Sequence, residues 1–102
     1  DAAPVDDSLP ATTQLIGNAP NPFNPRTTIS FALARPGPVR LEIFDVKGRL
    51  VRRLADRSFD AGHHRIVWDG RDENRFEAAS GVYFSRLQTT DHKTTDKMLL
   101  VR

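Results

Sequence analysis

The stretch that decides the fold is "RTTISFALARPGPVRLEIFDV", residues 26–46. Apolar side chains occupy every second position over residues 29–33 and again over residues 39–43, with polar or small residues between them. An alternation of period two predicts β-strands that bury one face. The letters "ARPGP" at residues 34–38 predict a turn, because proline and glycine adopt backbone angles that a central strand does not use. The stretch therefore predicts two strands joined by a turn.

The same pattern continues through the rest of the chain. A hairpin loop is expected at residues 45–48, where Gly48 is placed to adopt a positive φ. Residues 71–80 are polar and typical of a loop, and no window of a dozen residues has a helical period. The further strands expected are residues 49–55, 63–70, 81–90 and 93–102. Six or seven short strands at regular spacing predict an all-β antiparallel sandwich with no substantial helix.

Trp68 and Tyr83 narrow the fold class to an immunoglobulin-like sandwich. Tyr83 lies near the start of an expected strand, two residues before Ser85, as in a tyrosine corner whose hydroxyl bonds to the backbone. Trp68 supplies a large core group on the strand before the loop that leads to Tyr83. Antibody domains instead carry their tryptophan on strand C beside a cysteine pair, and this chain has no cysteine. We therefore expect an Ig-like antiparallel β-sandwich of about seven strands outside the antibody family.

The composition is that of a folded globular domain. The chain has 102 residues, of which 38% are hydrophobic and 27% charged, so it fits a single domain with a modest core. No apolar run approaches the roughly 18 residues of a membrane span, and the first residues lack the pattern of a signal peptide. The absence of cysteine excludes disulfides and thiol catalysis. The formal charge of +2 is a weak argument for an anionic partner.

The first residues differ in composition from the rest. Residues 1–13 begin acidic and are rich in Ala, Pro, Ser and Thr, which is typical of a flexible linker. We expect residues 1–13 to be a linker from an upstream domain and residues 14–102 to form one Ig-like domain.

The segment "NAPNPFNP", residues 18–25, precedes the first clearly alternating strand. Its three prolines restrict the chain to extended or turn geometry, and its three asparagines can cap turns through their side chains. Phe23 is the one large apolar side chain of the segment. We expect Phe23 to act as a peg that seats this segment against the end of the sandwich.

Four short motifs follow one another along the chain. They are "NPFNPRTTI", a D-x-x-G-R at residues 45–49, a W-D-G at residues 68–70, and "SGVYF". Together they resemble the C-terminal type IX secretion sorting domain of bacterial secreted proteins, which is itself similar to the Ig-like domain of the flagellar hook-capping protein. The resemblance departs at Arg75 and Phe76, where that family commonly has a glycine and then a small or proline-containing step. The motif residues are Asn21, Pro22, Phe23, Asn24, Pro25, Asp45, Gly48, Trp68, Asp69, Gly70, Gly81 and Tyr83.

The resemblance implies a non-catalytic module at the end of a larger exported protein. In that family an outer-membrane export machine recognises the domain, which directs secretion or attachment to the cell surface while an upstream domain carries the activity. The partners implied are this export machinery and the upstream domain of the same polypeptide. The residues expected to be recognised belong to the last strand: Lys97, Met98, Leu99, Leu100, Val101 and Arg102.

An alternative function is a structural or carbohydrate-binding Ig-like accessory domain of an extracellular enzyme. Sugars stack on flat aromatic rings, so this alternative requires an exposed aromatic platform. The candidates for such a platform are Phe44, Phe59, Phe76 and Phe84.

Metal binding has little support in the sequence. His63 and His64 are adjacent, and neighbouring residues of a strand point to opposite faces, so they cannot readily bind one ion together. Asp69, Asp72 and Asn74 offer oxygen ligands at short spacing and are candidates for calcium. They lack the register of an EF-hand loop, and turns use the same residue types. Turn chemistry is therefore the preferred interpretation, and no cofactor is expected.

Catalysis and nucleic-acid binding are not expected either. The serines have no nucleophile motif around them, so the chain is not expected to be an enzyme. Arginines could form a basic face on neighbouring strands, but nucleic-acid binding also needs aromatic rings interleaved with that charge, and most rings here sit where a core needs them. We expect these arginines to keep the sheet soluble and to protect edge strands from pairing. They are Arg49, Arg52, Arg53, Arg57 and Arg65.

Overall fold

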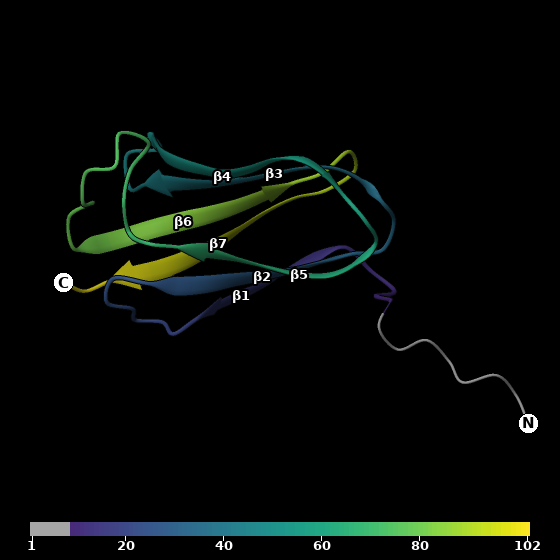
Figure 1. Cartoon of the computed structure of the whole chain (residues 1–102), viewed down its shortest axis with the longest axis horizontal. Coiled ribbons are helices and arrows are strands. Elements are labelled where there is room, and N and C mark those ends of the chain that lie inside the picture. The colour runs from purple at the N-terminus through teal and green to yellow at the C-terminus, as the bar shows by residue number, and fades with distance from the viewer. Residues whose placement is uncertain (1–8) are drawn as a thin grey trace, which may run out of the picture.

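The computed structural model describes residues 9–102, which form seven strands in two sheets that face each other (Figure 1). The strands are β1 (Gln14–Ala19), β2 (Thr27–Leu33), β3 (Gly37–Asp45), β4 (Leu50–Phe59), β5 (Gly62–Trp68), β6 (Gly81–Gln88) and β7 (Lys93–Leu100). One sheet has the order β1-β2-β5 and the other β4-β3-β6-β7. All strand pairs are antiparallel. The prediction of an all-β, Ig-like antiparallel sandwich is confirmed.

In strands β2 and β3, the alternating apolar side chains predicted from the sequence point into the space between the two sheets. In β2, the side chains of Ile29, Phe31 and Leu33 are buried, and β3 buries every second side chain from Val39 to Ile43 in the same way. Each strand is paired on both sides, β2 with β1 and β5, and β3 with β4 and β6. The two most regular segments of the sequence are therefore the central strands of the two sheets.

Strands β5, β6 and β7 each end two residues earlier than predicted, and three larger differences concern β1, β3 and β4. Strand β1 was not expected, because Gly17 and the irregular pairing between Leu15 and Gly17 interrupt the alternation there. Strand β3 begins at Gly37, inside the predicted turn, and β4 continues to Phe59, through residues expected to be a loop. Gly37 and Phe59 are pairing partners, and Phe59 is buried, so long-range pairing extends both strands beyond their local signals.

Trp68 lies at the centre of the aromatic part of the core, as predicted. Its side chain is completely buried, and its ring contacts those of Phe23 and Tyr83 at centroid distances of 5.6 and 5.3 Å. Its indole Nε1–H donates a hydrogen bond of 3.0 Å to the carbonyl of Arg71. The buried ring therefore keeps its one polar group paired while it joins the two sheets.

Tyr83 forms the predicted tyrosine corner. Its hydroxyl donates a hydrogen bond of 2.6 Å to the carbonyl of Ala79, four residues upstream. Burial, and to a lesser degree the carboxylate of Asp45, raises the pKa of the Tyr83 hydroxyl above its ordinary value, so the hydroxyl remains a donor. The bond fixes the end of the loop that enters β6.

Residues 1–8 of the expected linker lie outside the described residues. Residue Gln14 begins β1, and the hydroxyl oxygen of Thr13 accepts a hydrogen bond of 3.0 Å from the amide of Ala34. Residues 9–13 lie at one end of the sandwich and Arg102 lies at the other (Figure 1). Within residues 9–102, no helix is long and apolar enough to cross a membrane.

Candidate recognition surface at the C-terminal strand

Strand β7 divides the residues expected to be recognised into two groups. Met98 and Leu100 point into the core and are buried, with exposed fractions of 1% and 0%. Lys97 and Leu99 alternate with them and are exposed on the outer face of the sheet. Of these four, Lys97 and Leu99 offer side chains to a partner while the domain stays folded, and Val101, directly after the strand, is also exposed.

Residues 21–23, which we call the NPF clip, cover the C-terminal end of the free edge of β7. The amide of Phe23 donates to the carbonyl of Leu99 at 3.0 Å, and the amide of Val101 donates to the carbonyl of Phe23 at 2.9 Å. Asn21 adds its side-chain Oδ1, which accepts a hydrogen bond of 3.0 Å from the amide of Leu99. The clip therefore satisfies backbone groups that an edge strand otherwise leaves unpaired.

Phe23 anchors the clip in the core. Its side chain is 2% exposed and forms part of the cluster that surrounds Trp68. The three Xaa–Pro peptide bonds around it, at Pro20, Pro22 and Pro25, are all cis. The prediction that Phe23 acts as a peg is confirmed, and the structure adds that the peg holds the clip against β7.

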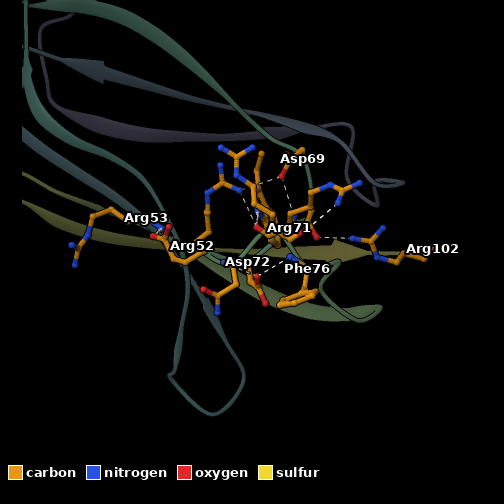
Figure 2. Close-up of polar contacts among 12 residues, drawn as sticks. Arg52, Arg53, Asp69, Arg71, Asp72, Phe76 and Arg102 are labelled. Atoms are coloured by element: carbon orange, nitrogen blue, oxygen red, sulfur yellow. Dashed lines mark hydrogen bonds and ion pairs between the residues drawn. The ribbon is translucent and has the colours of Figure 1, made fainter.

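Arg102 fastens the end of β7 to the loop of residues 69–80 (Figure 2). Its guanidinium donates to the carbonyl of Ala78 through Nε at 2.6 Å and to the carbonyl of Gly70 at 2.5 Å. It also forms an ion pair of 3.4 Å with Glu77. Its amide donates to the hydroxyl of Ser80 at 2.9 Å. Arg102 is thus held by four different residues of this loop.

The same loop covers the edge of β4. The amide of Glu73 donates to the carbonyl of Val51 at 3.0 Å, and its carboxylate accepts a hydrogen bond of 2.6 Å from the amide of Arg53. Arg52 reaches across to the carboxylate of Asp69 at 3.4 Å and to the carbonyl of Arg71 at 3.2 Å (Figure 2). The loop of residues 69–80 therefore joins the edge of β4 to the end of β7.

The candidate calcium ligands serve as turn acceptors. One carboxylate oxygen of Asp72 accepts hydrogen bonds from the amides of Asn74 and Phe76 at 2.9 and 3.0 Å. Asp69 accepts in the same way from the amide of Arg71 at 3.0 Å. Residues 9–102 contain no group of three histidine or carboxylate side chains placed to hold a metal ion. Calcium binding here stays a prediction that the geometry does not favour.

Arg75 is where the sequence departs from the pattern of the family that it resembles, and its backbone conformation is unusual for a residue other than glycine. Its φ is +70°, a left-handed conformation that favours glycine. The family glycine would adopt this conformation without strain, whereas here an arginine adopts it. Arg75 therefore occupies a backbone conformation that glycine adopts more readily.

The turn of residues 45–48 is organised by one carboxylate. Asp45 accepts hydrogen bonds from the amides of Arg49 and Lys47 at 3.0 and 2.9 Å, and its second oxygen pairs with the Arg49 side chain at 3.0 Å. The bond from the Arg49 amide is the main reason that the pKa of Asp45 lies below its ordinary value of 3.8. Gly48 has a φ of +79°, as the sequence predicted.

Of the four aromatic residues proposed as a sugar platform, only Phe44 and Phe84 come together, as half-buried pairing partners on β3 and β6. Phe59 is buried in the core, so its assignment to an exposed platform was wrong. Phe44 is covered by the guanidinium of Arg86, whose central carbon lies 4.2 Å from the ring centroid. Phe76 is 69% exposed but lies on the loop of residues 69–80, away from the sheet.

The histidines and arginines do not assemble into the metal site or the basic face considered in the sequence analysis. His64 packs against Phe31 and Phe59 while His63 is exposed, which confirms that the adjacent histidines point to opposite faces. Arg65 lies on β5, in the other sheet from the four remaining arginines, so one continuous basic face does not form.

Two features of this region had no signal in the sequence analysis. The bond between Asn21 and Leu99 joins residues 78 positions apart, and the bonds of Arg102 reach loop residues 24 and 32 positions away. Alternation reports which face of a strand is buried, but it carries no information about what covers the strand's edge. Only information on contacts between residues far apart in the chain would reveal these bonds.

The fold and the covered edges define a class: an Ig-like β-sandwich whose last strand is locked in place by a segment preceding the second strand. Residues 17–93 match the FlgD Ig-like domain family. The chain belongs to this family. The match ends at the first residue of β7, so Arg102 and most of the last strand lie beyond it. No curated protein matches the chain by sequence.

Solved structures share this fold. Dimeric latent PorU from Porphyromonas gingivalis aligns with a TM-score of 0.69 at 23% identity, over 87% of this chain and 9% of that one. PorZ, an essential bacterial surface component of the type-IX secretion system of the same organism, aligns at 0.56 and 22%, over 83% and 11%. FlgD from P. aeruginosa aligns at 0.58 and 25%, over 72% and 57%. The chain thus spans about a tenth of the length of PorU and PorZ.

Proposed function

We propose that this domain is a non-catalytic sorting module that directs a larger protein through the type IX secretion system to the outside of a bacterial cell or to its surface. Its partner is the outer-membrane export machinery. Residues 1–13 link it to an upstream domain that carries the activity of the whole polypeptide. Support comes from the order of the motifs and from the folds of PorU and PorZ, in which a domain of this kind is a small part of a much longer chain.

The arrangement of β7 is the single observation that carries the proposal. The last strand is built into the sheet, with Met98 and Leu100 in the core and its edge bonded to the NPF clip. Its outward side chains, Lys97 and Leu99, remain available on a fixed surface. A partner would therefore recognise the folded end of the sandwich and not a loose terminal peptide.

A carbohydrate-binding role receives less support from the same structure. Stacking of a sugar requires an open aromatic face, and of the four candidate rings Phe59 is buried and Phe44 is covered by Arg86. Phe84 is half-buried beside Phe44, and Phe76 lies on a loop apart from both, so no flat open platform forms.

The test is a fusion of residues 1–102 to a secreted reporter in a host that has a type IX system. The variant Lys97→Glu with Leu99→Ser changes the outward side of β7, and Lys93→Glu is the matched control. Lys93 is also exposed, on the same strand and four residues away, a separation of about 13 Å along the strand. Substitutions are preferred to deletion of residues 93–102, because deletion would remove Met98 and Leu100 from the core.

We expect the unchanged fusion and Lys93→Glu to be exported alike, and the double variant to be retained in the cell. Failure to export the unchanged fusion would reject the sorting role. Equal export of all three fusions would leave sorting intact and reject strand β7 as the surface that is read.

A further inference from the structure

We propose that the outer face of the β4-β3-β6-β7 sheet, at the end that carries Arg102, docks a protein surface that is apolar at its centre and acidic at its rim. The inference rests on the proposed function, because the partner it describes is the export machinery that would read β7. It extends the contact from one strand to all four strands of the sheet. It also assigns a role to Phe44 and Leu50, which lie outside the four sequence motifs.

The outward side chains form one apolar group across the sheet. Phe44 of β3 is the pairing partner of both Leu50 on β4 and Phe84 on β6. Leu99 of β7 pairs with Val82 of β6 one step further along. Val46 follows Phe44 by two residues, in the turn. We call this group the apolar patch: Phe44, Val46, Leu50, Val82, Phe84 and Leu99.

The apolar patch is accessible in the folded domain. Val46, Leu50 and Leu99 are 68%, 43% and 39% exposed. Single exposed apolar residues are common on any protein, but neighbouring ones that span several strands are typical of an interaction surface. The other sheet exposes two large apolar side chains, Ile16 on β1 and Val67 on β5, which are separated by the central strand β2, and Val67 pairs there with Thr28, a polar residue.

The rim of the apolar patch is basic. Glu42 is only 3% exposed and binds two guanidinium groups, that of Arg53 at 2.9 Å and that of Arg86 at 3.2 Å. The Arg86 guanidinium also lies over the ring of Phe44, which holds it beside the patch. Five basic side chains against three carboxylates leave two positive charges in excess around the patch. The basic side chains are Lys47, Arg49, Arg53, Arg86 and Lys97, and the carboxylates are those of Glu42, Asp45 and Glu73, the last bonded to the amide of Arg53.

The positive charge around the apolar patch determines which kind of partner can bind there. A second copy of the domain would bring two basic rims together, so self-association through the patch is disfavoured. An acidic rim on a different protein would be attracted and oriented by the same charges. Residues 9–13 lie at the opposite end of the sandwich, so the patch is clear of the point where the chain enters the domain (Figure 1).

The experiment uses the fusion of residues 1–102 to the secreted reporter and changes only Val46, in the turn after β3, and Leu50 of β4. Val46→Asp with Leu50→Asp places two carboxylates in the patch without altering β7. The control is Val67→Asp, which makes the same change at an exposed valine of similar accessibility, 49%, on the other sheet. Circular dichroism melts of the isolated variants check that each is folded.

We expect Val46→Asp with Leu50→Asp to lower reporter export by about tenfold or more, as loss of a central contact does, while Val67→Asp matches the unchanged fusion. Unchanged export of this double variant, with export lost in the Lys97→Glu and Leu99→Ser variant, would overturn the apolar patch and leave the sorting role standing. Absence of export even for the unchanged fusion would instead reject the sorting role itself.

A second measurement separates a protein partner from a lipid surface. The isolated domain is sedimented with phosphatidylglycerol vesicles, with and without Val46→Asp and Leu50→Asp. We expect little binding in either case. Binding that the two substitutions abolish would overturn the proposal in favour of a membrane-docking face, since basic rims and apolar side chains also suit anionic lipid.

Discussion

Gly70 is the residue at which an added methyl group would meet the protein backbone most closely. Its φ is +77°, and a Cβ atom there would lie 2.8 Å from the carbonyl oxygen of Pro25 and 3.0 Å from the Arg102 guanidinium. Gly48 has almost the same φ, +79°, but nothing lies within 4 Å of its Cβ position. The two glycines therefore separate the cost of backbone conformation from the cost of close packing.

We expect Gly48→Ala to lower the free energy of unfolding by about 1 kcal/mol, the cost of a left-handed conformation for alanine. Gly70→Ala carries the same cost together with overpacking against Pro25 and Arg102, so its loss should reach about 2 to 4 kcal/mol. Urea denaturation of both variants measures the difference. Equal losses would mean that Gly70 does not pack against the segment of Pro25 as the structure has it.

The structural roles of some residues could be predicted from the sequence, and those of others could not. Tyr83 and Gly48 were predicted correctly because their roles depend on neighbours within four residues. Phe59 was misjudged because its burial depends on pairing with Gly37, 22 positions earlier in the chain. Local chemistry is visible in a single sequence, whereas burial that arises from distant pairing is not.

At the scale of the element, the NPF clip makes β7 a protected edge. The amide of Leu99 has a side-chain acceptor in Asn21, and the amide of Val101 has a backbone acceptor in Phe23. Edge strands that keep their amides and carbonyls free are templates for pairing with other chains. The clip therefore explains why a motif with no chemistry of its own is placed ahead of β2.

Asn21→Ala tests the clip by amide hydrogen exchange. We expect the Leu99 amide to exchange up to about tenfold faster, because a hydrogen bond contributes about 1 kcal/mol. The Val101 amide, bonded to the backbone of Phe23, should change less, and the Leu41 amide in the centre of β3 should not change. Uniform acceleration at all three amides would show general destabilisation, and an unchanged Leu99 amide would mean that Asn21 does not hold the edge.

The elements themselves were largely predictable. Strands β2 and β3 followed from alternation, and the loop at residues 45–48 from its glycine. Strand β1 could not be predicted, because "QLIGNA" contains a glycine at an irregular pairing and only its pairing with β2 makes it a strand. The six residues predicted for export recognition lie on β7 or directly after it, but the sequence could not show which of them face outward or what closes the edge of the strand.

At the scale of the whole molecule, the β4-β3-β6-β7 sheet has backbone contacts along part of its edges, whereas its outer face is open. The C-terminal end of the β7 edge is covered by the NPF clip, and the β4 edge is covered at Val51 and Arg53 by the loop of residues 69–80. The outer face of the same sheet keeps exposed apolar side chains inside a basic rim. At this end of the sheet, covered edges and an open apolar face favour binding by side-chain complementarity over strand addition.

Recognition of the folded end is the central claim, and one measurement tests it most directly: the amount of reporter outside the cell when it carries either residues 1–102 or residues 93–102 alone. We expect the full chain to be exported and the ten-residue segment to be retained, because the clip, the core and the other strands that hold Lys97 and Leu99 in place are then missing. Equal export by residues 93–102 alone would contradict the account, since it would show that a terminal peptide is sufficient.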